Sequence, residues 1–129
     1  FPIGPIIQSG TIEDLSPEIM AAYDAPFPSR AYKAGARAFP MLVPTSPDDP
    51  SAAANRDAWE ALRNWRKPFL TAFSNRDPIT RGGARAFRES VPGAVDQPHT
   101  TIRNAGHFLQ EEQGPELARI VIDFVNRDL

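Results

Sequence analysis

The 129-residue chain contains no cysteine, which excludes disulfide bonds and metal sites that use cysteine ligands. It has no apolar run near the roughly 20 residues of a membrane span, and its start lacks a signal-peptide pattern. We therefore expect a cytoplasmic location. The net charge of −2 provides no basic surplus, so we expect neither nucleic acid nor a membrane as a partner.

Two catalytic-loop motifs are also missing. No Gly-x-Ser-x-Gly segment occurs, nor an equivalent with Asp or Cys at its centre, which is the turn that presents the nucleophile in many hydrolases. Gly82-Gly83 lacks the Lys-Ser/Thr ending of a phosphate-binding loop. No nucleophile is indicated within these residues. The 14 prolines and the start at Phe1 lead us to expect a piece of a longer polypeptide.

The pattern of apolar residues divides the chain near residue 67. The first region is rich in proline and predicts three helices, at about 16–23, 29–39 and 55–66. Ser16-Pro17 is a good helix start, with a serine cap and proline at the first helical position. The second of these helices should end or kink at Pro40.

The second region, 67–129, predicts an alternation of strand, helix, strand and helix. The strands are the apolar run 68–74 and the weaker segment 99–103. Their alternation with helices is typical of a parallel sheet in an α/β fold. The final helix carries one apolar stripe, formed by Leu117, Ile120, Val121, Phe124 and Val125. Since two strands cannot bury such helices, we expect the rest of the sheet to lie elsewhere.

Asp77 and His107 follow the two predicted strands. In parallel sheets the reacting groups gather at the carboxyl ends of the strands, so neighbouring strands would bring these side chains together. A carboxylate fixes the tautomer of a histidine base and stabilises its charged form. Acid before histidine is also the chain order in α/β-hydrolases. If each residue is considered alone, a structural interpretation is also open: Asp77 could be a turn residue, and His107 could cap a loop.

Three other polar residues have structural interpretations. His99 precedes its strand, which places it at the opposite edge of the sheet, and we interpret it as structural. Glu111-Glu112 is interpreted as a solvated pair at the start of a helix, because no second histidine is suitably spaced for a metal site.

Five segments together closely resemble haloalkane dehalogenases. They are 23–28 (YDAPFP), 32–40 (YKAGARAFP), 44–50 (PTSPDDP), 77–80 (DPIT) and 104–111 (NAGHFLQE). The resemblance covers nearly the whole chain and implies the C-terminal part of an α/β-hydrolase fold. Residues 1–66 would form part of the helical cap and the return to the core, and 67–129 the last two strands of the core with their helices.

The resemblance also implies roles for single residues. His107 would be the base that activates water against an alkyl-enzyme ester, and Asp77 the acid that orients it. The remaining matches would line an apolar substrate pocket: Phe39, Pro40 and Val43 from the cap, Ile79 and Phe108 from the core. Trp59 and Trp65 are expected to pack rather than bind halide.

The implied reaction converts a haloalkane into an alcohol and a halide ion without metal or cofactor. The nucleophilic Asp and the halide-binding residues would belong to the N-terminal half of the same enzyme, so the isolated chain should be inactive. The alternatives are an epoxide hydrolase or carboxylesterase of the same fold, or a non-catalytic module that retains it.

Overall fold

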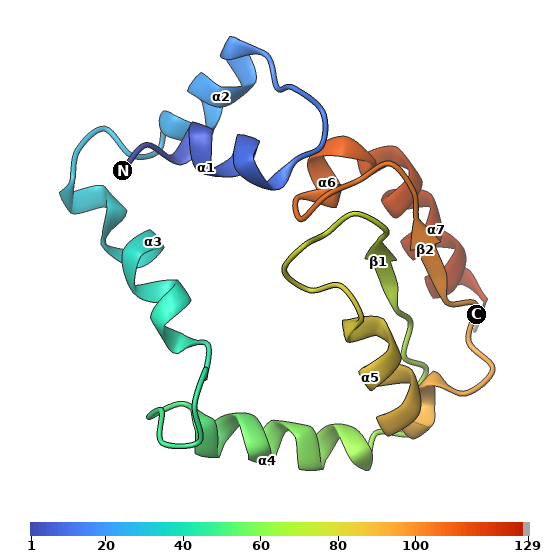
Figure 1. Ribbon diagram of the computed structural model, residues 1–129. Coiled ribbons are helices and arrows are strands. Elements are labelled where there is room, and N and C mark those ends of the chain that lie inside the picture. The colour runs from blue at the N-terminus through green and yellow to red at the C-terminus, as the bar shows by residue number, and fades with distance from the viewer. Residues whose placement is uncertain (128–129) are drawn as a thin grey trace.

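The chain follows an open ring of helices that closes on a small parallel sheet (Figure 1). The computed structural model describes residues 1–127. The elements are α1 (Ile3–Gly10), α2 (Pro17–Asp24), α3 (Ala34–Ala38), α4 (Ala52–Arg63), β1 (Ala72–Ser74), α5 (Gly83–Ser90), β2 (Thr100–Ile102), α6 (Leu109–Glu112) and α7 (Gly114–Asn126). Short 3₁₀ turns lie at Ala31–Lys33, Phe39–Leu42 and Pro92–Ala94.

Helix α2 begins as predicted, since the Ser16 side chain accepts a hydrogen bond from the backbone N–H of Ile19. Helix α1 was not predicted. It packs against α2, where the backbone N–H of Ile3 donates to Asp24 Oδ1 at 2.7 Å. Gly4 allows the close approach, because a Cβ there would lie 2.6 Å from the carbonyl oxygen of Met20.

The other two predicted helices of the first region need correction. Helix α3 ends at Ala38, and Pro40 lies within the 3₁₀ turn that follows. Proline is tolerated there because the first turn of a helix does not need its N–H. Helix α4 begins and ends three residues earlier than predicted, at Ala52 and Arg63.

Strands β1 and β2 are parallel, as predicted, and Ala72 pairs with Thr100 and Ser74 with Ile102. Both are shorter than predicted, with three residues each. Residue Phe69 is instead bonded through its N–H to the carbonyl oxygen of Gly93, at 2.9 Å, so the start of the apolar run does not pair with β2. The protein is therefore mixed α/β with two parallel strands.

An aromatic cluster joins α4 to α5 and the sheet. Trp59 stacks on Phe87 with ring centroids 5.1 Å apart, and Phe69 and Phe73 lie 5.6 and 6.3 Å from the same ring. Such contacts add to the hydrophobic stabilisation of a core. Trp59 thus packs, as expected, whereas Trp65 is exposed, with the Lys67 ammonium 5.8 Å from its ring.

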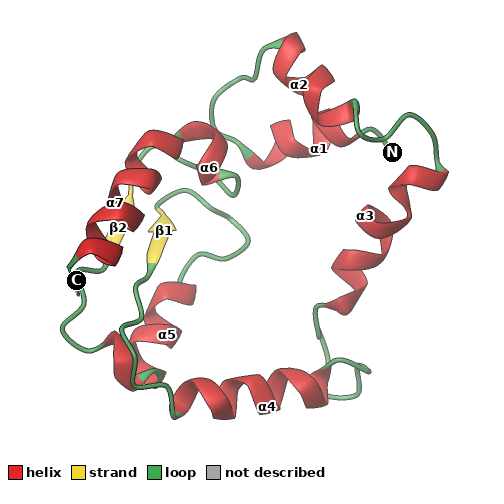
Figure 2. Ribbon diagram, turned by 180° about the vertical axis from the view of Figure 1, so that it is seen from behind, coloured by secondary structure: helices red, strands yellow, loops and turns green. Residues whose placement is uncertain are grey.

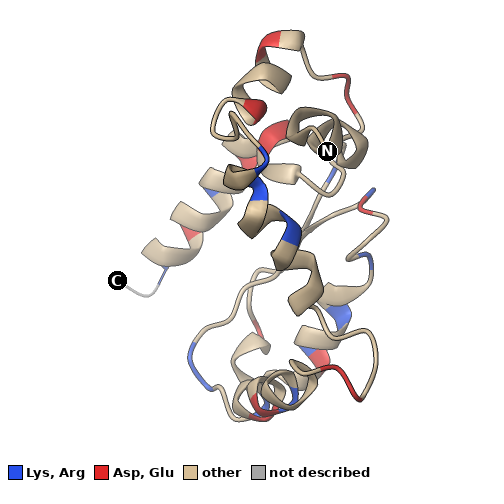
Figure 3. Ribbon diagram, turned by 90° about the vertical axis from the view of Figure 1, so that its left-hand side faces the viewer, with Lys and Arg blue, Asp and Glu red and all other residues tan. Residues whose placement is uncertain are grey.

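Much apolar surface is left uncovered. The accessible surface of the chain is 9138 Å², whereas a compact monomer of its mass would expose about 6,800 Å². Val121 and Val125, in the predicted stripe of α7, are exposed, and no helix within residues 1–127 covers α7 from outside (Figure 2). Acidic and basic residues are interspersed along the chain (Figure 3). No described helix is long and apolar enough to span a membrane.

Candidate active site

The loops that carry Asp77 and His107 leave the sheet at the same edge. Beyond Ser74 and Ile102 the two connections stay side by side. The N–H of Asn75 donates to the carbonyl oxygen of Ile102 at 2.9 Å, and that of Arg76 to the carbonyl oxygen of Ala105 at 3.1 Å. These bonds continue the pairing of the strands and hold both loops in register.

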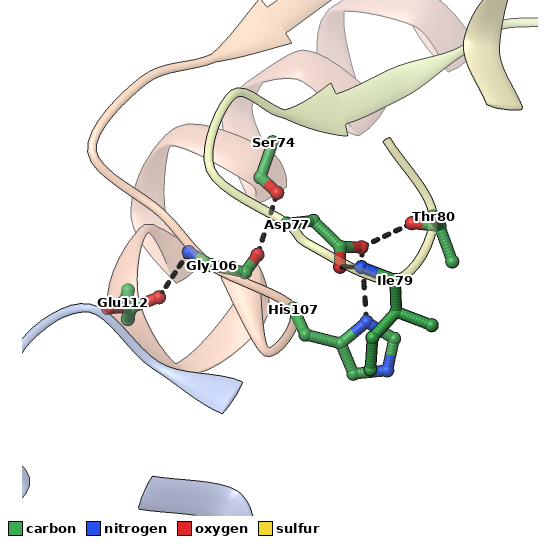
Figure 4. Close-up of polar contacts among 7 residues, drawn as sticks. All are labelled: Ser74, Asp77, Ile79, Thr80, Gly106, His107 and Glu112. Carbon is green, nitrogen blue, oxygen red and sulfur yellow. Dashed lines mark hydrogen bonds and ion pairs between the residues drawn. The ribbon is translucent and has the colours of Figure 1, made fainter. Parts of the chain in front are cut away.

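The structure brings Asp77 and His107 into contact. His107 Nδ1 lies 3.1 Å from Asp77 Oδ2 (Figure 4). The backbone N–H of Ile79 donates to Asp77 Oδ1 at 2.7 Å, and the Thr80 hydroxyl donates to Oδ2. Asp77 is 4% exposed, whereas 31% of the His107 side chain is exposed. The acid is thus fixed from several sides while the imidazole reaches the surface.

Opposing effects act on the Asp77 carboxyl. Burial alone would raise its pKa, because a charged group is less stable away from water. Hydrogen bonds from Thr80 and His107 and from the backbone N–H groups of Ile79 and Thr80 outweigh burial and lower the pKa to about 2. Asp77 is therefore ionised at neutral pH and can only accept hydrogen bonds.

The charge of Asp77 determines the tautomer of neutral His107. Because Oδ2 can only accept, Nδ1 must carry the proton, and Nε2 is left with its lone pair. Nε2 makes no hydrogen bond with any residue from 1 to 127. An imidazole in this state can accept a proton from water, and the neighbouring carboxylate stabilises the imidazolium that forms.

Main-chain hydrogen bonds fix the loop that presents His107. The Gly106 carbonyl oxygen accepts from the hydroxyl of buried Ser74 at 2.7 Å, and the Gly106 N–H donates to Glu112 Oε2 at 2.6 Å (Figure 4). The His107 N–H donates to the carbonyl oxygen of Gly10 at 2.7 Å. Sequence reasoning missed these partners. For Ser74, the available signal was its position as a polar residue at the end of an apolar run.

The interpretation of Glu111-Glu112 as a solvated pair is wrong. Glu111 Oε2 accepts a hydrogen bond from the Tyr23 hydroxyl at 2.6 Å, and this bond raises the pKa of Tyr23. Glu112 Oε1 accepts from the N–H groups of Ile12 and Glu13 at 2.6 and 2.9 Å. Both carboxylates therefore bind the first 25 residues to the His107 loop, which explains why they are only half-exposed.

His99 lies at the opposite end of β2, as predicted. Its Nδ1 accepts a hydrogen bond from the N–H of buried Thr71 at 3.1 Å. Its Nε2 lies 2.7 Å from the carbonyl oxygen of Ala94, to which it therefore donates. With both ring nitrogens engaged by the chain, His99 has a structural role.

The predicted pocket residues fall into two groups. Phe108 contacts His107 edge-on, with ring centroids 5.0 Å apart, and Ile79 beside Asp77 is 70% exposed. These two lie beside the Asp77–His107 pair.

The three residues assigned to the cap do not lie at this site. Phe39, Pro40 and Val43 are exposed in and after the 3₁₀ turn that follows α3. Pro40 lines an apolar groove formed with α1, and this groove includes neither Asp77 nor His107. The groove at Asp77 is lined instead by Ile12, Asn75, Arg76, Pro78 and Arg81. Within residues 1–127, no three His, Asp or Glu side chains gather as metal ligands.

Comparison with known proteins reveals close relatives. A haloalkane dehalogenase of Psychrobacter cryohalolentis is 51% identical over 126 residues, 98% of this chain and 42% of the relative. One from Mycobacterium marinum is 53% identical over 124 residues, 96% of this chain and 41% of the relative. This chain is a homologue of haloalkane dehalogenases. Haloalkane dehalogenase 1 of Mycobacterium tuberculosis is 50% identical over 124 residues, with the same coverage of 96% and 41%.

The dehalogenase homologue spans about two fifths of the length of the curated relatives it matches. No protein-family model matches the chain. The identity extends over both the helical first region and the strand-containing second region, since at least 96% of the chain is matched. The two parallel strands with their helices are thus part of an α/β-hydrolase chain.

Proposed function

We propose that this chain contributes the base and the acid of a haloalkane dehalogenase. The observation that carries the proposal is the Asp77–His107 hydrogen bond, which leaves Nε2 with a lone pair at the end of a parallel sheet. Homologues that are identical to this chain at about half of the aligned residues are named haloalkane dehalogenases. The substrate would be a small halogenated alkane and the products an alcohol and a halide ion.

The reaction proceeds in two steps. First, an aspartate carboxylate supplied from outside these 129 residues attacks the carbon that bears the halogen. The carbon–oxygen bond forms as the carbon–halogen bond breaks, and the halide leaves with the electron pair. The resulting alkyl-enzyme ester divides one difficult displacement into two easier steps.

The second step depends on His107. A water molecule attacks the ester carbonyl and transfers a proton to Nε2, while Asp77 stabilises the imidazolium at Nδ1. The tetrahedral intermediate then collapses, and the departing alkoxide takes the proton from the imidazolium. Alcohol is released, and the carboxylic acid that remains loses its proton to solvent, which regenerates the carboxylate. His107 thus acts on the ester and not on the haloalkane.

The division of roles predicts a kinetic signature for the His107→Ala variant of the complete gene product. With a bromoalkane as substrate, we expect a burst of about one bromide per enzyme molecule, after which turnover stops. Intact mass spectrometry should show protein carrying the alkyl group. The matched control is His99→Ala, which removes the structural histidine and should lower stability without accumulating alkylated protein.

Other outcomes would refute the proposal. If wild type hydrolyses epoxides or carboxylic esters but releases no bromide, the chain belongs to another hydrolase of this fold. If His107→Ala retains full activity, the pair is not catalytic. A bromide release at enzyme-like rates by the isolated 129-residue chain would show that no outside nucleophile is needed.

One observation weighs against an epoxide hydrolase. That reaction would use a pair of tyrosines directed at the epoxide oxygen. The Tyr23 hydroxyl is bound to Glu111, and Tyr32 is exposed to solvent on the 3₁₀ turn before α3. The two tyrosines of this chain are therefore not paired.

A further inference from the structure

Glu112 connects two segments that lie far apart in the chain. Its Oε2 accepts a hydrogen bond from the N–H of Gly106, the residue before His107. Its Oε1 accepts from the N–H groups of Ile12 and Glu13, which are 100 and 99 residues away. One carboxylate therefore satisfies three main-chain donors from both sides of the same junction.

The same junction is closed by a second set of bonds. The Gly10 carbonyl oxygen accepts from the N–H of His107 at 2.7 Å and from that of Phe108 at 3.4 Å. The contact is close, because a Cβ on Gly106 would lie 2.4 Å from this oxygen. A Cβ on Gly10 would lie 2.5 Å from the ring of Phe108. The backbone of His107 is thus held against residues 10–13.

We infer that Glu112 is a positioning residue for the His107 base. Asp77 holds the imidazole ring, but the direction of Nε2 also depends on where the His107 backbone lies. The backbone is fixed on one side by Ser74, through the Gly106 carbonyl oxygen, and on the other by Glu112 and Gly10. Without Glu112, the N–H groups of Gly106, Ile12 and Glu13 lose their acceptor, and the junction is left to the bonds of the Gly10 carbonyl oxygen.

Residue 112 needs a carboxylate because its main-chain partners are all hydrogen-bond donors. All three partners of Glu112 are N–H groups, and each carboxylate oxygen faces at least one of them. A glutamine of the same shape has a single oxygen. Its NH₂ group would therefore oppose an N–H on one side of the junction. The Glu112→Gln change removes the acceptor on that side with almost no change in volume.

This inference rests on the proposed function and predicts a defect in one step only. In the Glu112→Gln variant of the complete gene product, bromide should still be released in a burst of about one per enzyme molecule. The steady-state rate that follows should fall about 10- to 100-fold, because an ångström of misplacement has effects of this size. Rapid-quench measurement of bromide and intact mass spectrometry of the alkylated protein would give the two quantities.

Two further variants test the same junction in opposite directions. Glu112→Asp retains both acceptor oxygens and should recover part of the steady-state rate. Gly106→Ala disturbs the same junction through the Gly10 oxygen and should also accumulate alkylated protein. The matched control is Glu116→Gln on α7, since the Glu116 side chain makes no hydrogen bond within residues 1–127.

The outcomes separate the inference from the function on which it rests. Wild-type kinetics in Glu112→Gln, with alkylated protein accumulating in His107→Ala, would overturn the positioning role alone. An equal loss of burst and steady-state rate would mean that fewer molecules fold, and would overturn it too. Absence of bromide release from wild type would instead remove the proposed function.

Discussion

The buried carboxyl of Asp77 makes the stability of the fold depend on pH. Its pKa is about 2, against an ordinary value of 3.8. Because each pKa unit corresponds to about 1.4 kcal/mol, the ionised group stabilises the folded state by about 2 kcal/mol at neutral pH. The group is 4% exposed, so screening by solvent reduces this value little.

The direction of the pH effect follows from the lowered pKa. Above about pH 5 the carboxyl is ionised in the folded and the unfolded chain, and the whole contribution is present. As the pH falls from about 5 to about 2, the unfolded chain binds the proton first and most of the contribution is lost. Asp77→Asn, which cannot ionise, should lack this part of the acid destabilisation.

Urea denaturation of the complete gene product, followed by far-UV circular dichroism between pH 2 and 7, would measure the effect. The wild type should exceed Asp77→Asn in free energy of unfolding by a constant amount above about pH 5, and by about 2 kcal/mol less near pH 2. Asp57→Asn, on the exposed face of α4, is the control and should show a small difference at every pH. A difference for Asp77→Asn that does not vary with pH would contradict the reasoning.

Three other substitutions test the packing. Gly93→Ala should destabilise the fold by at least about 3 kcal/mol in urea denaturation, because its Cβ would lie 1.9 Å from the Lys67 carbonyl oxygen. Gly35→Ala, whose Cβ has open space in α3, should stabilise the fold by about 0.5–1 kcal/mol. A lower free energy of unfolding in this variant would mean that the added methyl group meets a steric clash. Phe87→Ala should cost about 3 kcal/mol and shift the fluorescence of Trp59 to the red; unchanged emission would mean that the stacking is absent.

Features with a local cause could be predicted from the sequence. Ser16 and Pro17 determine the start of α2 through capping and a fixed backbone angle, and both act within one turn. The place of Asp77 and His107 also follows from local patterns, because each lies in the loop that follows an apolar strand and parallel neighbours end at one edge. The assignment of their catalytic roles remains a proposal.

Features that depend on distant partners could not be predicted. The half-buried state of Glu112 requires N–H groups about 100 residues away, and nothing near Glu112 in the sequence indicates them. Helix α1 was missed because Pro2 and Pro5 suggest irregular structure, although proline is compatible with a first turn. The shortness of β1 follows from the bond between Phe69 and Gly93, which is again a contact between separate segments.

The junction between residues 10–13 and the His107 loop constrains the order of events during synthesis. The N–H of Ile12 is made 100 residues before the carboxylate of Glu112 that binds it. At about 5–20 residues per second, a ribosome needs roughly 5–20 s to cover that distance. During this interval α1 and α2 have been made, but the Glu112 carboxylate that binds the connection between them has not. The junction therefore forms only after Glu112 has been made, and chains released before that residue would carry the first two helices without it.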